Sequence, residues 1–205
     1  RLVQLPLAGL VTGATIWSTH FIAMLAYEPG YDHAYEPVLT GVSLLVGVLG
    51  SLAANAGLAF ARGAVGPILA GAIFGLTVSA MHYVGMQAYQ LPGTIDWRLG
   101  TVVVSVLLGI GFGAASYWGI ARQRSGLRGR ILPALLMCVA ICLMHFTGMS
   151  AIEIRLDSAV EVPPKAMSEA AMAMLIFGVT GIILLIAAAS ASIEMNMEDE
   201  TRNQL

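Results

Sequence analysis

Three short stretches of this sequence place a histidine and a methionine at the same spacing. They read WSTHFIAMLA (17–26), SAMHYVGMQA (79–88) and CLMHFTGMSA (142–151). In each stretch the methionine follows the histidine by four residues, so on a helix the imidazole and the thioether share one face, one turn apart. The candidate ligands are His20, Met24, His82, Met86, His145 and Met149, together with Met81 and Met144, which directly precede two of the histidines.

This set of side chains indicates a soft metal ion. Imidazole suits copper, zinc, iron and nickel, whereas thioether favours Cu(I). All the candidate groups are neutral, and the cost of burying an ion in lipid rises steeply with its charge, so a monovalent ion fits better than a divalent one. Structural zinc more often recruits thiolates, and calcium or magnesium takes oxygen ligands. The motif therefore predicts copper as Cu(I), with haem held by paired histidines as the alternative.

The composition places these motifs in a membrane. The chain is 58% hydrophobic and 11% charged, whereas soluble domains carry about a quarter charged residues. Apolar runs of roughly 20 residues are each long enough to cross about 30 Å of hydrocarbon as a helix. We predict an all-α integral membrane protein with six transmembrane helices, at about 4–26, 38–60, 67–89, 99–121, 131–152 and 169–192.

The histidines also reveal an internal repeat. His20, His82 and His145 are separated by 62 and 63 residues, the length of two membrane helices with their loops. The chain thus divides into three tandem two-helix repeats, approximately 1–62, 63–125 and 126–193, followed by a cytoplasmic connector or tail at 194–205. Because each repeat crosses twice, all three histidines return to one depth, roughly 10 Å below the outer boundary. We expect them to form one shared site.

The basic residues predict the orientation. Seven of ten lie at the chain ends or in the second and fourth connections, which should therefore be cytoplasmic, so both chain ends are expected inside. The other side carries Arg98, Arg155 and Lys165 against eight acids. The basic stretch ARQRSGLRGR (121–130) is explained as a topology determinant, and we expect no nucleic-acid partner. The cysteines Cys138 and Cys142 lie one turn apart on one helix and give no disulfide framework.

The three stretches resemble the MHYT domain, a bacterial integral-membrane sensor module named for a repeated Met-His-Tyr-Thr tetrapeptide. The resemblance rests on Met81-His82-Tyr83-Val84, Met144-His145-Phe146-Thr147 and the looser Thr19-His20-Phe21-Ile22. It implies motifs near the outer face of the bacterial cytoplasmic membrane, copper binding, and sensing of a diatomic gas or redox state. It also implies fusion to cytoplasmic diguanylate cyclase and phosphodiesterase domains, and a seventh helix before Arg1.

Several functions remain open at this point. The first is a copper-containing sensory input domain that relays O₂, CO, NO or redox state to a signalling domain in the same or a partner chain. The second is a copper-handling or transport protein, in which Asn55 is either a polar step toward the cytoplasm or a bond to a neighbouring helix. The third is a haem membrane protein. The residues show no enzyme motif, His33 is expected to be an ordinary loop residue, and a homodimer is left open.

Overall fold

Six long helices dominate the computed structural model, which describes residues 4–27, 30–122, 127–157 and 159–203. All six of these described helices are long and apolar enough to cross a membrane. Their bounds are α1 Gln4–Leu25, α2 Pro37–Ala59, α3 Val65–Gln87, α4 Leu99–Ala121, α5 Leu127–Met149 and α6 Glu169–Asn203. The predicted all-α membrane fold of three two-helix repeats is confirmed.

The helices alternate between inner and outer positions. Helix α2 packs against both α1 and α3, and α4 packs against both α3 and α5, while the inner helices α1, α3 and α5 approach one another through α3. Glycines allow the closest of these contacts: a Cβ on Gly13 would collide with the Gly47 carbonyl of α2, and one on Gly75 would collide with the Gly109 carbonyl of α4. The inner helices therefore carry the motifs at the centre of the bundle.

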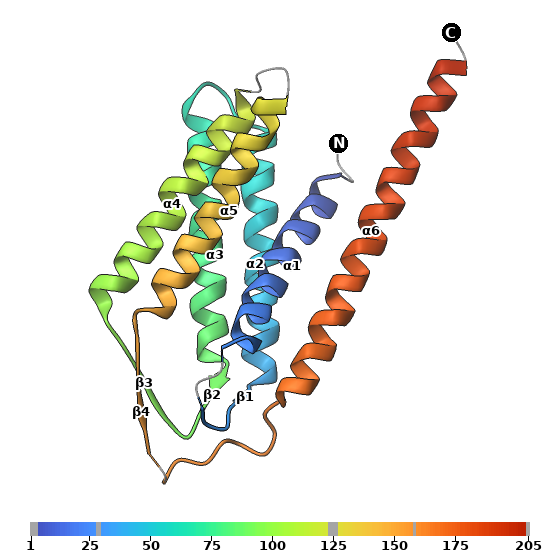
Figure 1. The fold of residues 1–205 in the computed structure, drawn as a ribbon. Helices are drawn as coiled ribbons and strands as arrows, with labels where there is room; N and C mark the ends of the chain where they lie inside the picture. The colour runs from blue at the N-terminus through green and yellow to red at the C-terminus, as the bar shows by residue number, and fades with distance from the viewer. Residues whose placement is uncertain (1–3, 28–29, 123–126, 158, 204–205) are drawn as a thin grey trace.

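Helix α6 differs from the other outer helices. It packs against α1 and makes at most marginal contact with α5 among the described residues. Figure 1 shows α6 beyond α1, on the side away from α5. The helix is also longer than its apolar run. The run ends near residue 192, but the helix continues without a break to Asn203, so the expected connector or tail at 194–205 is helical as far as it is described. At 1.5 Å per residue its length is about 50 Å.

At the end of the bundle opposite the start of α1 and the end of α6 (Figure 1), the connections form two small antiparallel sheets, where loops were expected. Strand β1 (Ala34–Tyr35) pairs with β2 (Tyr89–Gln90), and β3 (Gly93–Trp97) pairs with β4 (Ile152–Leu156). Hydrophobic and polar residues alternate in β3 and β4, which is typical of a β-strand with one buried face. Ile95 and Trp97 on β3, and Ile152 and Ile154 on β4, pack against the core, while the residues between them face outward. These sheets tie successive repeats together at one end of the bundle.

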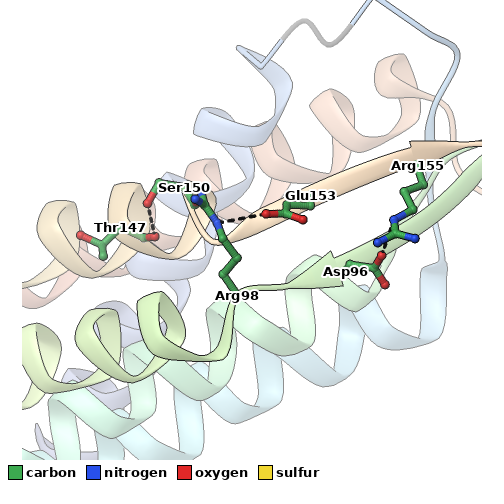
Figure 2. Close-up of polar contacts among 6 residues, drawn as sticks. All are labelled: Asp96, Arg98, Thr147, Ser150, Glu153 and Arg155. Atoms are coloured by element: carbon green, nitrogen blue, oxygen red, sulfur yellow. Dashed lines mark hydrogen bonds and ion pairs between the residues drawn. The ribbon is translucent and has the colours of Figure 1, made fainter.

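Ion pairs neutralise part of the acidic surface at this end of the bundle. Asp96 and Glu153 lie opposite each other in the β3–β4 register, and each meets an arginine: Arg155 Nε lies 2.8 Å from Asp96, and Arg98 Nε lies 3.5 Å from Glu153. Figure 2 shows these pairs, together with Arg98 donating to the Ser150 carbonyl at the end of α5. Since all four charged groups are at least half exposed, each pair stabilises the β3–β4 sheet by about 1 kcal/mol or less.

Candidate metal centre

The three motif histidines meet inside the bundle. His20 on α1, His82 on α3 and His145 on α5 are all buried, and one ring nitrogen from each lies within 4.8 Å of those of the other two. The Nδ1 atom of His20 lies 3.3 Å from Nδ1 of His145 and 3.3 Å from Nδ1 of His82. The equal spacing of the repeats thus brings the three imidazoles into one cluster, as the sequence predicts.

Two glycines determine the orientation of two of the imidazole rings. A Cβ on Gly85 would lie 2.6 Å from Nε2 of His20, and a Cβ on Gly148 would lie 2.6 Å from Nε2 of His82. Each of these rings therefore lies against the glycine of the next repeat, which directs its other nitrogen, Nδ1, toward the centre. Gly85 and Gly148 are the small residues between histidine and methionine in their motifs, and Ala23 holds that place in the first repeat.

The converging nitrogens suit a metal ion. Two nitrogens that each bind one metal at about 2.0 Å lie roughly 3.3 to 3.5 Å apart for angles of about 110 to 120°, so the observed 3.3 Å separations match such a pair. A neutral imidazole has one N–H, so three Nδ1 atoms cannot all be satisfied by hydrogen bonds to one another. A bound cation would satisfy all three lone pairs. Among the described residues, Nε2 of His20 and Nε2 of His82 have no hydrogen-bond partner.

The methionines do not all lie with the histidines. A cavity of about 80 Å³ beside the cluster is lined by all three histidines and by Met81 and Met144, the residues that precede His82 and His145. Met86, in contrast, lines a separate outer hollow formed by the end of α3, strands β2 and β3, and residues 160–163. Met24 is buried in the core and Met149 is half-buried against it. The sulfur layer at Met24, Met86 and Met149 therefore stays a prediction, and Met81 and Met144 share a cavity with the imidazoles.

Comparison with known proteins identifies the family of this chain. The family model described as "MHYT: Bacterial signalling protein N terminal repeat" matches three times, at residues 13–71, 75–132 and 139–196, and each match contains one of the clustered histidines. The chain belongs to the MHYT family. The predicted resemblance is confirmed, and the repeat that the histidine spacing indicates is the family's own repeat.

Relatives of this MHYT chain are signalling proteins. It is 35% identical over 95% of its length to an uncharacterized signaling protein of Caulobacter vibrioides, covering 24% of that protein. It is 38% identical over 68% of its length to the cyclic di-GMP phosphodiesterase NbdA of Pseudomonas aeruginosa, covering 19% of it. It is 32% identical over 92% of its length to the bifunctional diguanylate cyclase/cyclic di-GMP phosphodiesterase MucR of the same organism, covering 28% of it. No solved structure matches the chain.

The MHYT chain thus spans about a fifth to a quarter of the relatives it matches. The MHYT region is a sensory input domain, as predicted, and most of each relative lies outside the matched part. The prediction that this chain is not itself an enzyme therefore agrees with the family assignment.

An aromatic layer lies between the MHYT site and the end of the bundle that carries the two sheets. His33 was expected to be an ordinary loop residue, but its side chain is only 6% exposed and its Nε2 lies 3.2 Å from Glu169 at the start of α6. Its ring packs against Tyr35 and Tyr89, the residues that pair in the β1–β2 sheet. The two tyrosines that flank His33 in the stretch EPGYDHAYEP are the sequence feature that indicates an aromatic environment for this histidine.

The environment of this layer changes how its tyrosines titrate. Burial, together with the nearby Glu169 carboxylate, raises the pKa of Tyr35 to about 12. Burial also raises the pKa of Tyr89, with further contributions from Tyr31 and Tyr35. Both phenols are therefore held in the neutral form well above the pH at which an exposed tyrosine ionises.

The remaining candidates have structural contacts. Asn55 accepts a hydrogen bond from the Tyr117 hydroxyl at 2.8 Å, which links α2 to α4, so it bonds a neighbouring helix. Cys138 and Cys142 are free and exposed on α5, in agreement with the absence of a disulfide framework. Cys142 lines the histidine cavity, whereas Cys138 is not among its lining residues.

Proposed function

We propose that this MHYT domain is a copper-containing sensory input module whose His20, His82 and His145 hold one Cu(I) ion near the outer face of the bacterial cytoplasmic membrane. The observation that carries the proposal is the convergence of three Nδ1 atoms, two pairs of which are 3.3 Å apart. Bound copper would supply a soft, redox-active centre able to interact with a diatomic molecule such as O₂, CO or NO. The protein residues orient the ligand atoms and exclude water.

The donor set supports copper over the alternatives. Three neutral imidazoles in an apolar bundle carry no charge to offset a divalent ion, and thioether groups at Met81 and Met144 line the same cavity. Haem fits poorly, because axial nitrogens on one iron lie roughly 4 Å apart on opposite sides of a macrocycle. The observed pairs of Nδ1 atoms lie closer than that. Transport is disfavoured by Asn55, whose amide oxygen accepts the Tyr117 bond.

Helix α6 supports a relay to a cytoplasmic partner. Thr180 Oγ1 lies 3.3 Å from Ser18 Oγ, two residues from His20, so α6 contacts the helix that carries one of the ligands. The same helix continues to Asn203, past the end of its apolar segment. We propose that a change at the copper site alters the packing of α1 against α6, and that α6 transmits it to a cyclic di-GMP turnover domain in the same or a partner chain.

The proposed orientation places both chain ends in the cytoplasm and the two small sheets outside. It rests on the distribution of basic residues, and Figure 1 shows the start of α1 and the end of α6 at the end of the bundle opposite strands β3 and β4. Labelling of cysteines introduced at Arg62 and Thr94 with a membrane-impermeant reagent tests it. We expect only the Thr94 position to react in intact cells. Labelling at Arg62 alone would show that the orientation is the opposite one.

Copper stoichiometry tests the site directly. Replacing His82 or His145 by Ala should remove most bound copper from folded, monodisperse protein, because a buried Cu(I) cannot readily exchange a lost nitrogen for water. His33→Ala is the matched control, since His33 lies in the outer aromatic layer and outside the histidine cluster. Unchanged copper in a protein that lacks both His82 and His145 would refute the proposed site.

A further inference from the structure

The histidine cluster is enclosed unevenly. His82 is fully buried, whereas His145 is 8% exposed, the largest value among the three rings. The rings of His20 and His82 are covered by Gly85 and Gly148 of the next repeat. By the same cycle His145 should be covered from α1 at Ala23, but Ala23 is only half-buried, and both residues line the cavity beside the cluster. The bundle is therefore least closed on the side between α5 and α1.

The position of α6 explains why this side is open. Within the first two repeats the helices pack closely, α1 on α2 at Gly13 and α3 on α4 at Gly75. The residue that corresponds to Gly75 in the third repeat, 63 positions later, is Cys138, which is exposed. A side chain larger than glycine at this place prevents the same backbone approach, and α6 packs against α1 instead of α5. Among the described residues, the third interface consequently has no outer helix of the kind that closes the other two.

The cavity behind this opening has a defined size and chemistry. Its volume is about 80 Å³, and roughly 10–15 Å³ of such volume is enough to hold one water molecule, so it accommodates a small molecule of a few heavy atoms. Apart from the imidazoles and Thr19, whose hydroxyl donates to the Thr15 carbonyl, its lining is apolar or sulfur-bearing, with Val78, Ile141 and Met144 among its residues. A charged or strongly hydrated molecule would lose its water there without compensation. The cavity suits a small uncharged molecule that dissolves in lipid.

We propose that such a molecule reaches the histidine cluster sideways from the bilayer, through the opening between α1 and α5, and lodges in this cavity. The opening is bordered by Thr19 and Ala23 on α1 and by Cys142 and Phe146 on α5, and Phe146 is 66% exposed toward the surroundings of the bundle. The outer hollow is a less direct path, because none of the histidines is among its lining residues. This inference specifies the route to the proposed copper site and rests on that proposal only for the second arm of its test.

The first arm uses the metal-free chain and xenon. Xenon binds dry apolar cavities of this kind, so ¹²⁹Xe NMR of the full chain in nanodiscs should show one saturable site. Ile141→Phe should remove it by filling the cavity, whereas Ile182→Phe, at an exposed position on α6, should not. Saturable xenon binding lost only in Ile141→Phe supports the cavity even if copper never binds. Absence of saturable xenon binding in the wild-type chain overturns it.

The second arm uses the copper-loaded chain and carbon monoxide. Ala23→Leu and Thr19→Leu should narrow the opening, so association and dissociation of carbon monoxide should both slow by about tenfold. Ala8→Leu and Thr15→Leu are matched controls, because these residues are exposed on the same helix and do not line the cavity. Wild-type rates in both narrowing variants overturn the lateral route. Slowing of both rates in the narrowing variants, absent from the controls, supports it.

Discussion

Nδ1 of His20 lies 3.3 Å from Nδ1 of His145, although 125 residues separate them in the chain. The contact joins the first repeat to the third and closes a cluster that every repeat supplies with one imidazole. Because neighbouring rings rest against glycines of the next repeat, the ring orientations depend on helix packing throughout the bundle. A metal bound at this cluster would therefore be sensitive to small relative movements of α1, α3 and α5.

The methionines can be ranked by position. We expect Met81→Leu and Met144→Leu to lower copper affinity by ~10-fold or more with little effect on zinc, because Leu keeps the volume but removes a soft donor from the histidine cavity. Met86→Leu and Met149→Leu should have the same sign with a smaller effect. Met172→Leu, at a buried position on α6, is the control. Competitive titration measures both metals, and equal copper affinity in all five variants would contradict a role for sulfur.

The glycines beside the rings should be intolerant of a methyl group. In Gly148→Ala the new Cβ would lie 2.6 Å from Nε2 of His82, so the ring must turn away from the cluster and copper affinity should fall at least tenfold. Gly111→Ala on α4 is the matched control, because a Cβ there meets nothing within 4 Å. That control should be slightly more stable, by up to about 1 kcal/mol, since alanine favours a helix over glycine. Metal titration and thermal unfolding separate the two effects, and copper affinity equal to wild type in Gly148→Ala would show that the ring position is unimportant.

The contact between α1 and α6 should carry the response. Thr180→Val keeps the side-chain shape but removes the 3.3 Å contact with Ser18. We expect unchanged copper stoichiometry and reduced copper-dependent protection of α6 in hydrogen exchange, with α3 and α5 protected as in the wild type. Ser190→Ala removes a bond from the Ser190 hydroxyl to the Ile186 carbonyl within α6 and serves as the control. Full protection of α6 in Thr180→Val would place the relay elsewhere.

The outer aromatic layer should be sensitive to alkaline pH. The pKa of Tyr35 is raised to about 12 by burial and by Glu169, above its value of about 10 in an unfolded chain. The folded state therefore favours the neutral phenol, and this stabilising contribution is complete below about pH 10 and lost as the pH rises toward 12. Thermal unfolding should show this loss in the wild type and a smaller one in Tyr35→Phe. Ionisation of all tyrosines near pH 10, followed by ultraviolet absorbance, would contradict the burial of this layer.

Periodicity determined much of this protein. Apolar runs of membrane length fixed the six helices, and the 62- and 63-residue separations placed the histidines at one depth. The four-residue spacing and small residues between His and Met indicated one helix face that packs closely, because these properties depend only on helical rise and residue size. The family resemblance followed from the same residues and is confirmed by the three repeat matches.

Only the tertiary structure decided which atoms meet. Sequence spacing places a ring on a face but not its rotation, so the convergence of Nδ1 and the packing of Nε2 against Gly85 and Gly148 appear only once the helices are packed. Met81 and Met144 line one cavity and Met86 lines another, and this difference arises from contacts between distant segments. The burial of His33 against Glu169 has the same origin. Tandem repeats predict equal interfaces, but the third is open, because Cys138 stands where glycine allows close helix approach and α6 lies against α1.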